Sequence, residues 1–331
     1  MMSKPLVSVV CTNYNKGDWI KDAIDSFLRQ EVNFEYEIVI IDDKSTDHSP
    51  EIIKEYLEKH PDKIRVFYNS ENLGITRTWI KACKQAKGKY VARCDGDDFW
   101  VDNKKLQKQV DLLEKSKVSK WCYTDYDAIS SAGKVIHEAV FETRVIDRPK
   151  SYAELLVTKG FTAPSSWLIE KKLLQDINDC IDLSAVDDTF NIQLELFNKT
   201  KPTYIPDTTT VYRISEGSDS KPKEESDVKK RDERLLDTQL EYINKYTGVE
   251  YKEIITMLLR RDVDREDRLR LINRQRKYIE EQDHLLRERQ EIIQQKDRQI
   301  NELLNSKKYK IGKALTAPIS ITKAALKERK K

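Results

Sequence analysis

The chain has 331 residues, of which 35% are charged, and its mean hydropathy is −0.71. No apolar run approaches the roughly 20 residues that a helix needs to cross a bilayer, and the N-terminus lacks the apolar core of a secretion signal. The five cysteines are scattered and form no CxxC pair, which argues against zinc-ribbon and dithiol motifs. We therefore expect a cytoplasmic protein with reduced thiols.

The net charge of +3 is unevenly distributed along the chain. Residues 307–331 contain nine lysines and arginines but one acid, Glu328, whereas the first two-thirds of the chain is slightly acidic. This pattern argues against a body that binds nucleic acid, and it favours an anionic surface as a partner of the C-terminal end.

The first hundred residues alternate between apolar strands and amphipathic helices. The expected strands cover residues 6–11, 37–41, 64–68 and 90–93, and the expected helices cover residues 18–30, 49–60 and 75–86. Apolar strands separated by helices predict an α/β domain whose mostly parallel, Rossmann-like sheet is covered on both faces. Ligands of such sheets bind at the carboxyl ends of the strands. Polar clusters follow the first, second and fourth strands, where that rule places a site.

The sequence between residues 100 and 227 gives weaker signals. We expect a helix over residues 103–116, strands near residues 120–124 and 209–213, and a polar linker over residues 217–227.

A long helix is predicted after the linker, because residues 249–311 contain no glycine or proline. Apolar residues recur every seven positions at Ile272, Ile279, Leu286, Ile293 and Ile300. A strict seven-residue repeat favours a left-handed coiled coil. The positions three residues further on are polar, at Gln275, Gln282, Arg289 and Lys296, so the apolar seam is narrow. The helix therefore forms a homo-oligomer through residues 258–306, packs on the body or marks the site of another partner.

The stretch VARCDGDDFW, residues 91–100, places Asp95, Asp97 and Asp98 directly after the fourth strand. Carboxylates this close repel one another and raise each other's pKa. Asp and Gly are common in turns, so a turn with a helix cap is one interpretation. The other is a site for Mn²⁺ or Mg²⁺, which take carboxylate oxygens and share their shell with substrate phosphates. Neither an EF-hand loop nor a phosphate-binding P-loop is present.

Five short motifs occur in order along residues 7–100. They read VSVVCTNYN, IDDKSTD, ENLGITR, AKGKY and DGDDFW. Together they resemble the ordered motifs of glycosyltransferase family 2, and the likeness covers about residues 5–215. The resemblance implies a GT-A fold, a sugar-nucleotide donor, a divalent metal (Mn²⁺ or Mg²⁺) and inversion at the anomeric carbon.

The resemblance also implies a role for several nucleotide-binding residues. By position in the motifs, the nucleoside is held by Thr12, Tyr14, Asn15 and Asp43, and Asp95 lies near the ribose.

The remaining site residues follow from the later motifs of the family. Asp97 is the expected metal ligand, assisted by Asp98, and Arg213 faces the diphosphate although the histidine that usually follows is Ser215 here. The catalytic base of the family lies in an acidic pair that opens a helix, which corresponds to Asp187 and Asp188 and points to Asp188.

Three further residues are candidate contacts to the donor or acceptor. Asp187 lies beside the expected base, and Trp100 and Trp167 either stack on sugar rings or pack in the core. The main hypothesis is an inverting, metal-dependent glycosyltransferase. It moves a sugar from a nucleotide-sugar, with UDP favoured, to a hydroxyl of a glycan or lipid-linked glycan in bacterial surface polysaccharide synthesis.

Two alternatives belong to other functional classes. One is a non-catalytic scaffold that binds nucleotide-sugars and assembles through its coiled coil. The other, a nucleotidyltransferase, is disfavoured because the loop after the first strand is not rich in glycine.

The chain is expected to divide into four parts. Residues 1–222 form the catalytic domain, 223–257 a helical connector, 258–306 the long helix, and 307–331 a basic amphipathic tail. The tail either docks on an anionic membrane, which would place the protein on the inner face of the plasma membrane, or acts as a disordered solubilising segment.

Overall fold

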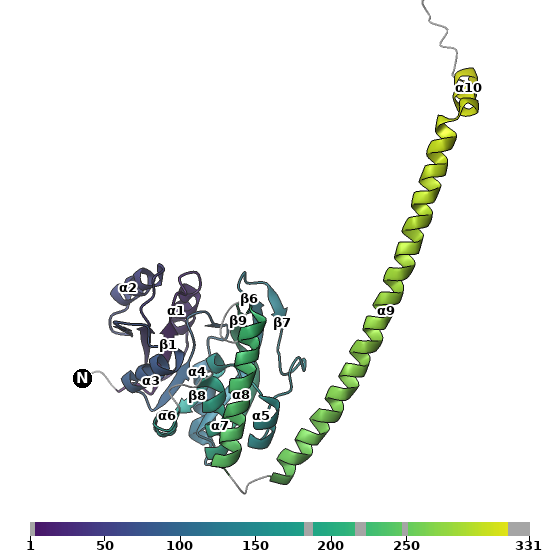
Figure 1. Ribbon diagram of the computed structural model, residues 1–331. Coiled ribbons are helices and arrows are strands. Elements are labelled where there is room, and N and C mark those ends of the chain that lie inside the picture. The colour runs from purple at the N-terminus through teal and green to yellow at the C-terminus, as the bar shows by residue number, and fades with distance from the viewer. Residues whose placement is uncertain (1–3, 182–187, 216–222, 247–250, 317–331) are drawn as a thin grey trace, which may run out of the picture. The chain divides into compact units, whose positions relative to one another are not determined.

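The computed structural model describes residues 4–181, 188–215, 223–246 and 251–316, and Figure 1 shows their arrangement. The chain forms two compact units, Met1–Leu258 and Leu259–Lys331. The first contains a mixed, mostly parallel sheet flanked by helices, as the sequence predicts, and the second contains most of the long helix.

Within the described residues, one nine-stranded sheet has the order β3-β2-β1-β4-β8-β6-β9-β5, with β7 paired to β6. The strands are β1 Val7–Asn13, β2 Tyr36–Asp42, β3 Ile64–Tyr68, β4 Tyr90–Arg93, β5 Phe99–Trp100, β6 Trp121–Ser130, β7 Val135–His137, β8 Leu168–Glu170 and β9 Thr203–Ile214. Strands β1 to β4 are mutually parallel, as are β6 and β9, whereas β8 and β5 run antiparallel to their neighbours.

Helices cover both faces of this sheet. Successive side chains of a strand point to opposite sides, so a single strand contributes to two cores. On β1, Val7 and Val9 join the core formed with α1, α2 and α4, while Val10 joins the core formed with α3 and α5 to α8. The helices are α1 Ile20–Leu28, α2 Ser49–Lys59, α3 Ile75–Gln85, α4 Lys105–Lys115, α5 Tyr152–Thr158, α6 Lys171–Asn178, α7 Asp188–Lys199, α8 Glu225–Lys245, α9 Tyr251–Asn305 and α10 Lys307–Thr316, with a short 3₁₀ helix, η1, at Pro164–Ser166.

The position of β1 in the sheet indicates where a ligand is expected to bind. The chain leaves β1 to form β2 and β3 on one side, then returns to form β4 on the other side of β1. In parallel sheets, such a reversal of strand order opens a crevice at the carboxyl ends of the two strands. Thr12 near the end of β1 and the three aspartates after β4 both lie at this edge.

Helix α8 belongs to the first unit and packs against its other helices. The side chain of Gln239 donates a hydrogen bond to the carbonyl of Leu156 on α5. Lys245 and Tyr246 both reach the buried carboxylate of Glu195 on α7, at 2.7 and 2.8 Å. Residues 225–246, which belong to the segment that we expected to be a connector, thus pack within the first unit and support α7.

The second unit is described for residues 259–316, which contain most of α9 and all of α10. The side chains that repeat along α9 are 47–62% exposed, at Leu271, Ile272, Tyr278, Ile279, Leu285, Leu286, Ile292, Ile293 and Ile300. No helix of the described residues combines the length and the apolar character that a membrane span requires. Residues 317–331, the larger part of the predicted tail, lie outside the described residues.

Candidate active site

The loop after β4 continues alongside the end of β1. The amide of Gly96 donates to the carbonyl of Thr12 at 3.0 Å, and the hydroxyl of Thr12 donates to Asp95 Oδ1 at 2.7 Å. A Cβ atom on Gly96 would lie 3.0 Å from Asn13 Oδ1 and 3.1 Å from Ile20 Cδ1. A side chain at this position would therefore crowd Asn13 and Ile20, which favours glycine inside the acidic motif.

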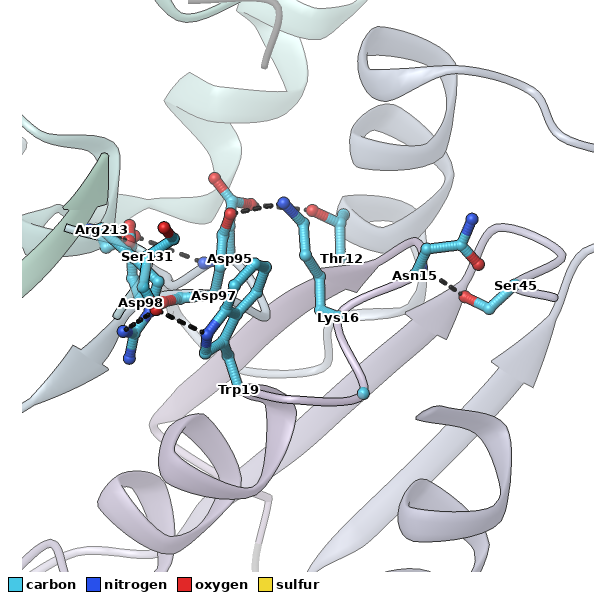
Figure 2. Close-up of polar contacts among 12 residues, drawn as sticks. Thr12, Asn15, Lys16, Trp19, Ser45, Asp95, Asp97, Asp98, Ser131 and Arg213 are labelled. Atoms are coloured by element: carbon cyan, nitrogen blue, oxygen red, sulfur yellow. Dashed lines mark hydrogen bonds and ion pairs between the residues drawn. The ribbon is translucent and has the colours of Figure 1, made fainter. Parts of the chain in front are cut away.

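The three aspartates occupy different environments, as Figure 2 shows. Asp95 is partly exposed and pairs with Arg93 at 3.3 Å. Asp97 has an 18% exposed side chain, and its Oδ2 lies 2.5 Å from the ammonium of Lys16. Asp98 is 2% exposed. The motif therefore offers one buried and two accessible carboxylates.

Asp98 connects the acidic loop to two other elements of the fold. Its Oδ2 accepts a hydrogen bond from Ser165 Oγ of η1 at 2.5 Å, and its Oδ1 accepts one from the backbone amide of Arg213 on β9 at 2.8 Å. Burial raises the pKa of Asp98 well above its usual value, and the charge of Asp97 raises it further, against the lowering effect of these two hydrogen bonds. Its contacts fit a structural carboxyl group better than a metal ligand.

Arg213 contacts the same loop, and its guanidinium is buried. Its Nε donates to the backbone carbonyl of Asp97 at 3.0 Å, and its Nη1 lies 3.4 Å from the carbonyls of Ser130 and Ser131. Its Nη2 pairs with Asp22 of α1 at 3.6 Å. The guanidinium therefore holds the backbone of the acidic loop, and a direct contact with the diphosphate stays a prediction.

The loop after β1 is tied to the loop after β2. Asn15 has a positive φ of 53°, a conformation that asparagine tolerates better than most residues. Its amide donates to Ser45 Oγ at 2.9 Å, and its Oδ1 accepts from the amide of Thr46 at 2.8 Å. The neighbouring Tyr14 is 44% exposed at this edge, so its ring is accessible to a base.

Asp43 lies in the predicted nucleoside site but is itself buried. Its Oδ1 accepts from Asn69 Nδ2 at 2.7 Å and from the amide of Leu73 at 2.9 Å, and its Oδ2 accepts from the amide of Gly74 at 2.9 Å. Gly74 has a φ of 80° and is the N-cap residue directly before α3. Asp43 therefore organises the loop that contains the ENLG motif, and its contact with a nucleoside stays a prediction.

The two tryptophans that we considered as sugar contacts belong to the core. Trp100 is 1% exposed and donates to the carbonyl of Ser165 at 2.8 Å. Trp167 is fully buried, donates to the carbonyl of Thr162 and packs edge-on against Trp121. Of the two interpretations left open by the sequence, core packing is the one that the structure shows, because neither ring reaches the surface.

The predicted base lies at the limit of what the structure describes. Asp187 and the side chain of Asp188 are outside the described residues, although the backbone of Asp188 begins α7. Their roles as base and donor or acceptor contact stay predictions.

Two residues of the site were not predicted from the sequence. Lys16 directly follows the first motif, in the loop TNYNK that begins at Thr12, so its position in the sequence already pointed to the site. Ser165 lies in a stretch without a motif and is brought to Asp98 by the fold alone.

Burial tends to lower the pKa of Lys16, but the charge of Asp97 and its hydrogen bond outweigh this effect and raise the pKa above its usual value.

The accessible carboxylates fit a divalent cation that shares its shell with a ligand. Among the described residues, no group of three His, Cys, Asp or Glu side chains is arranged to hold a metal ion. Asp97 and the neighbouring Asp95 nevertheless supply hard carboxylate oxygens at the crevice. Mg²⁺-type sites commonly use one or two carboxylates together with substrate phosphates, and that is the kind of site these residues could form.

The family profile described as "Glycosyl transferase family 2" matches residues 8–177, just over half of the chain. The chain belongs to glycosyl transferase family 2. The matched range covers nearly all of β1, the acidic loop and η1, whereas Asp188 and Arg213 lie beyond it.

Several curated proteins resemble part of the chain. A putative teichuronic acid biosynthesis glycosyltransferase of Bacillus subtilis, TuaG, is 38% identical over 138 residues, which are 40% of this chain and 53% of TuaG. An uncharacterised protein of Mycobacterium tuberculosis is 37% identical over 117 residues, which are 35% of this chain and 34% of that protein. The chain thus spans between about a third and about half of the length of these relatives.

Solved structures show that the chain has the GT-A fold of this family. S. aureus TarS 1-349 in complex with UDP-GlcNAc aligns with a TM-score of 0.57 at 19% identity, over 76% of this chain and 70% of that one. The mannosyltransferase PcManGT from Pyrobaculum calidifontis, in complex with GDP-Man and Mn²⁺, aligns with a TM-score of 0.56 at 16% identity, over 77% and 69%.

The different environments of Asp97 and Asp98 lead to a stability prediction. Asp98→Ala leaves the amide of Arg213 and the hydroxyl of Ser165 without their buried acceptor, so we expect it to lower the free energy of unfolding by about 2–4 kcal/mol. Asp97→Ala removes a partly exposed ion pair and should change it by less than about 1 kcal/mol. Urea denaturation of both variants measures the difference; equal effects would contradict the structural role of Asp98.

Proposed function

We propose that the protein is an inverting, metal-dependent glycosyltransferase. It transfers a sugar from a nucleotide-sugar, with a UDP-sugar favoured, to a hydroxyl of a glycan or lipid-linked glycan. The single observation that supports this most strongly is that an exposed tyrosine and two accessible carboxylates lie at one edge of the sheet, at the ends of β1 and β4.

The donor would bind along this edge from the nucleoside to the diphosphate. The ring of Tyr14 is exposed and free to stack on a base, and the Thr12–Asp95 hydrogen bond presents the Asp95 carboxylate beside the expected ribose. Asp97 would hold the cation, with Asp95 nearby, while Asp98 stays in the fold. When bound, a divalent cation supplies Lewis-acid stabilisation of the charge that develops on the leaving diphosphate.

The chemistry on the acceptor side requires one base. Asp188, at the first position of α7, would take the proton of the acceptor hydroxyl as its oxygen attacks the anomeric carbon. The C–O bond to the diphosphate breaks in the same step, and the nucleoside diphosphate leaves with the bonding electrons. One displacement inverts the configuration at that carbon, so the protein needs no covalent intermediate and no second carboxylate as nucleophile.

The acceptor class is proposed from the relatives. TuaG is named for teichuronic acid biosynthesis, and we propose that this chain likewise acts in the synthesis of a bacterial surface polysaccharide. Such a role places the protein in the cytoplasm, where nucleotide-sugars are made, and at the inner face of the plasma membrane when the acceptor is lipid-linked.

Asp188→Asn tests the base directly. We expect it to reduce sugar transfer by at least about a thousandfold, because the amide cannot accept the hydroxyl proton. Binding of UDP in the presence of Mn²⁺ should remain within about threefold of wild type, since Asp188 would not contact the nucleotide. The product formed from a screened UDP-sugar is quantified by mass spectrometry, and UDP binding by calorimetry. Unchanged transfer by the variant would overturn the assignment of the base, and donor binding without any transfer or hydrolysis by wild type would favour the scaffold hypothesis.

We also propose that α9 assembles the protein with a second copy of itself. A straight α-helix drifts by about 20° per heptad relative to a strict seven-residue repeat, so the stripe from Ile272 to Ile300 would turn by about 80° over four heptads. It stays in line only on a helix that supercoils about a partner with a matching repeat, and α9 itself carries that repeat. The polar residues three positions after each apolar one, which are Gln275, Gln282, Arg289 and Lys296, leave the apolar seam narrow. A narrow seam fits a weak coiled coil.

The basic residues after α9 are proposed to dock on an anionic membrane surface. Helix α10, Lys307–Thr316, contains four lysines among its ten residues, and each basic residue near such a surface contributes on the order of 1 kcal/mol. A lipid-linked acceptor would then meet the enzyme at the bilayer.

Two measurements on full-length variants test these C-terminal proposals. In size-exclusion chromatography with light scattering, we expect wild type to exceed the 38.9 kDa chain mass by a factor of at least about two, and Ile279→Asp with Leu286→Asp to return it to one chain. In sedimentation with phosphatidylglycerol vesicles, removal of residues 307–331 should abolish binding. A monomeric wild type removes the first proposal, and equal sedimentation of the two chains removes the second.

A further inference from the structure

Lys16 and Asp97 come from two different loops and meet at the crevice, as Figure 2 shows. Lys16 lies between β1 and α1, and Asp97 lies in the loop after β4. Lys16 Nζ is 2.5 Å from Asp97 Oδ2, and the two side chains are 26% and 18% exposed. The pair is thus accessible to solvent and to a ligand, unlike the buried carboxyl of Asp98 beside it.

The ion pair reduces the repulsion among the three carboxylates of the acidic motif. Asp95 has Arg93 as its ionic partner, and Asp98 is held by a hydroxyl and a backbone amide. The guanidinium of Arg213 contacts the backbone carbonyl of Asp97 and not its carboxylate. Within the part of the chain that the structure describes, the charge of the Asp97 carboxylate is therefore offset by the ammonium of Lys16.

The backbones on both sides of the pair are fixed. The carbonyl of Lys16 accepts hydrogen bonds from the amides of Trp19 and Ile20 at 2.9 and 2.8 Å, at the start of α1. The next residue, Gly17, donates to Asp47 at 2.7 Å. On the other side, Arg213 holds the backbone of the Asp97 loop. Separation of the pair therefore requires rotation of the lysine's four-carbon stem and no movement of either loop.

We propose that Lys16 is the internal counter-ion of Asp97 in the donor-free enzyme, and that it competes with a divalent cation for this carboxylate until the donor's diphosphate enters. The inference rests on the proposed function, in which Asp97 holds the cation. An ammonium already on Oδ2 both occupies the oxygen and repels a second positive charge. A bound diphosphate would offer the displaced ammonium a new anionic partner.

This competition would link the binding of the cation to the binding of the donor. Without nucleotide, the cation must displace Lys16 from its salt bridge and leave the ammonium without a partner. With a nucleoside diphosphate present, the ammonium gains an interaction as it leaves Asp97. Binding of Mn²⁺ and of UDP should therefore be mutually favourable, and the coupling must have the same size in both directions.

The test measures Mn²⁺ binding to the full chain, without activity, by electron paramagnetic resonance of free Mn²⁺ with and without UDP. In Lys16→Met, which keeps the length of the stem and removes the charge, we expect Mn²⁺ without nucleotide to bind roughly five- to tenfold more tightly than in wild type. The factor by which UDP enhances Mn²⁺ binding should fall in the same variant.

Three control variants separate this role from general effects. Lys21→Met removes an exposed lysine of α1 and should leave the binding of Mn²⁺ unchanged. Lys16→Arg retains the positive charge and should behave as wild type does. Asp97→Asn should lose Mn²⁺ binding both with and without UDP.

The outcomes distinguish this proposal from the proposed function. If Lys16→Met binds Mn²⁺ no more tightly than wild type or Lys21→Met, while Asp97→Asn abolishes binding, the competition is overturned and the metal site at Asp97 stands. If UDP enhances Mn²⁺ binding equally in Lys16→Met and wild type, the coupling role is overturned. If wild type binds no Mn²⁺ even with UDP, the metal site and the competition both fail.

Discussion

The repulsion among three carboxylates within four residues is the constraint around which this active site is built. The fold resolves it by giving each acid a different partner. Asp98 is buried under donors from η1 and β9, Asp95 pairs with Arg93 and Thr12, and Asp97 reaches the ammonium of Lys16. The two accessible carboxylates, Asp95 and Asp97, suit the site to a cation and, through it, to an anionic donor.

The same partners join distant parts of the chain to the acidic loop. Ser165, which holds Asp98, lies three residues after Thr162, and Thr162 is bonded to Gln193 of α7 through both its amide and its hydroxyl. Two residues further along α7, Glu195 receives Lys245 and Tyr246. These polar contacts are joined through the backbone of residues 162–165 and of α7, and they connect the end of α8 to the acidic loop, so α8 supports the site although it follows the family's motifs.

The sequence predicted the parts of the fold that depend on local patterns. The parallel strands and helices up to Arg93 are found within two residues of their expected limits, because apolar strands and amphipathic helices of ordinary length have strong periodicity. Strands β5 and β8 were missed, since two or three residues give no period to detect. The family and its GT-A fold were predicted from motifs whose order along the chain, more than any single residue, is specific.

The site was predicted only in part, because burial depends on tertiary packing. The sequence placed Asp97 and Asp98 in one role, yet the structure turns one carboxylate outward and the other into the fold. From the sequence alone, Trp100 and Trp167 cannot be told from exposed tryptophans that stack on sugar rings. In the structure, each indole N–H donates to a buried carbonyl and each ring packs in the core. Ser165 could not be inferred at all, since its contact with Asp98 spans 67 residues of sequence.

The most direct test of the central claim is to locate the cation. Diffraction data collected near the manganese absorption edge, from crystals of the full chain grown with UDP and Mn²⁺, would show its position as an anomalous peak. The account predicts a peak bonded to a carboxylate oxygen of Asp97, with Asp98 still held by Ser165 and the amide of Arg213. A peak on Asp98, or UDP bound in the crevice with no peak near Asp97, would contradict it.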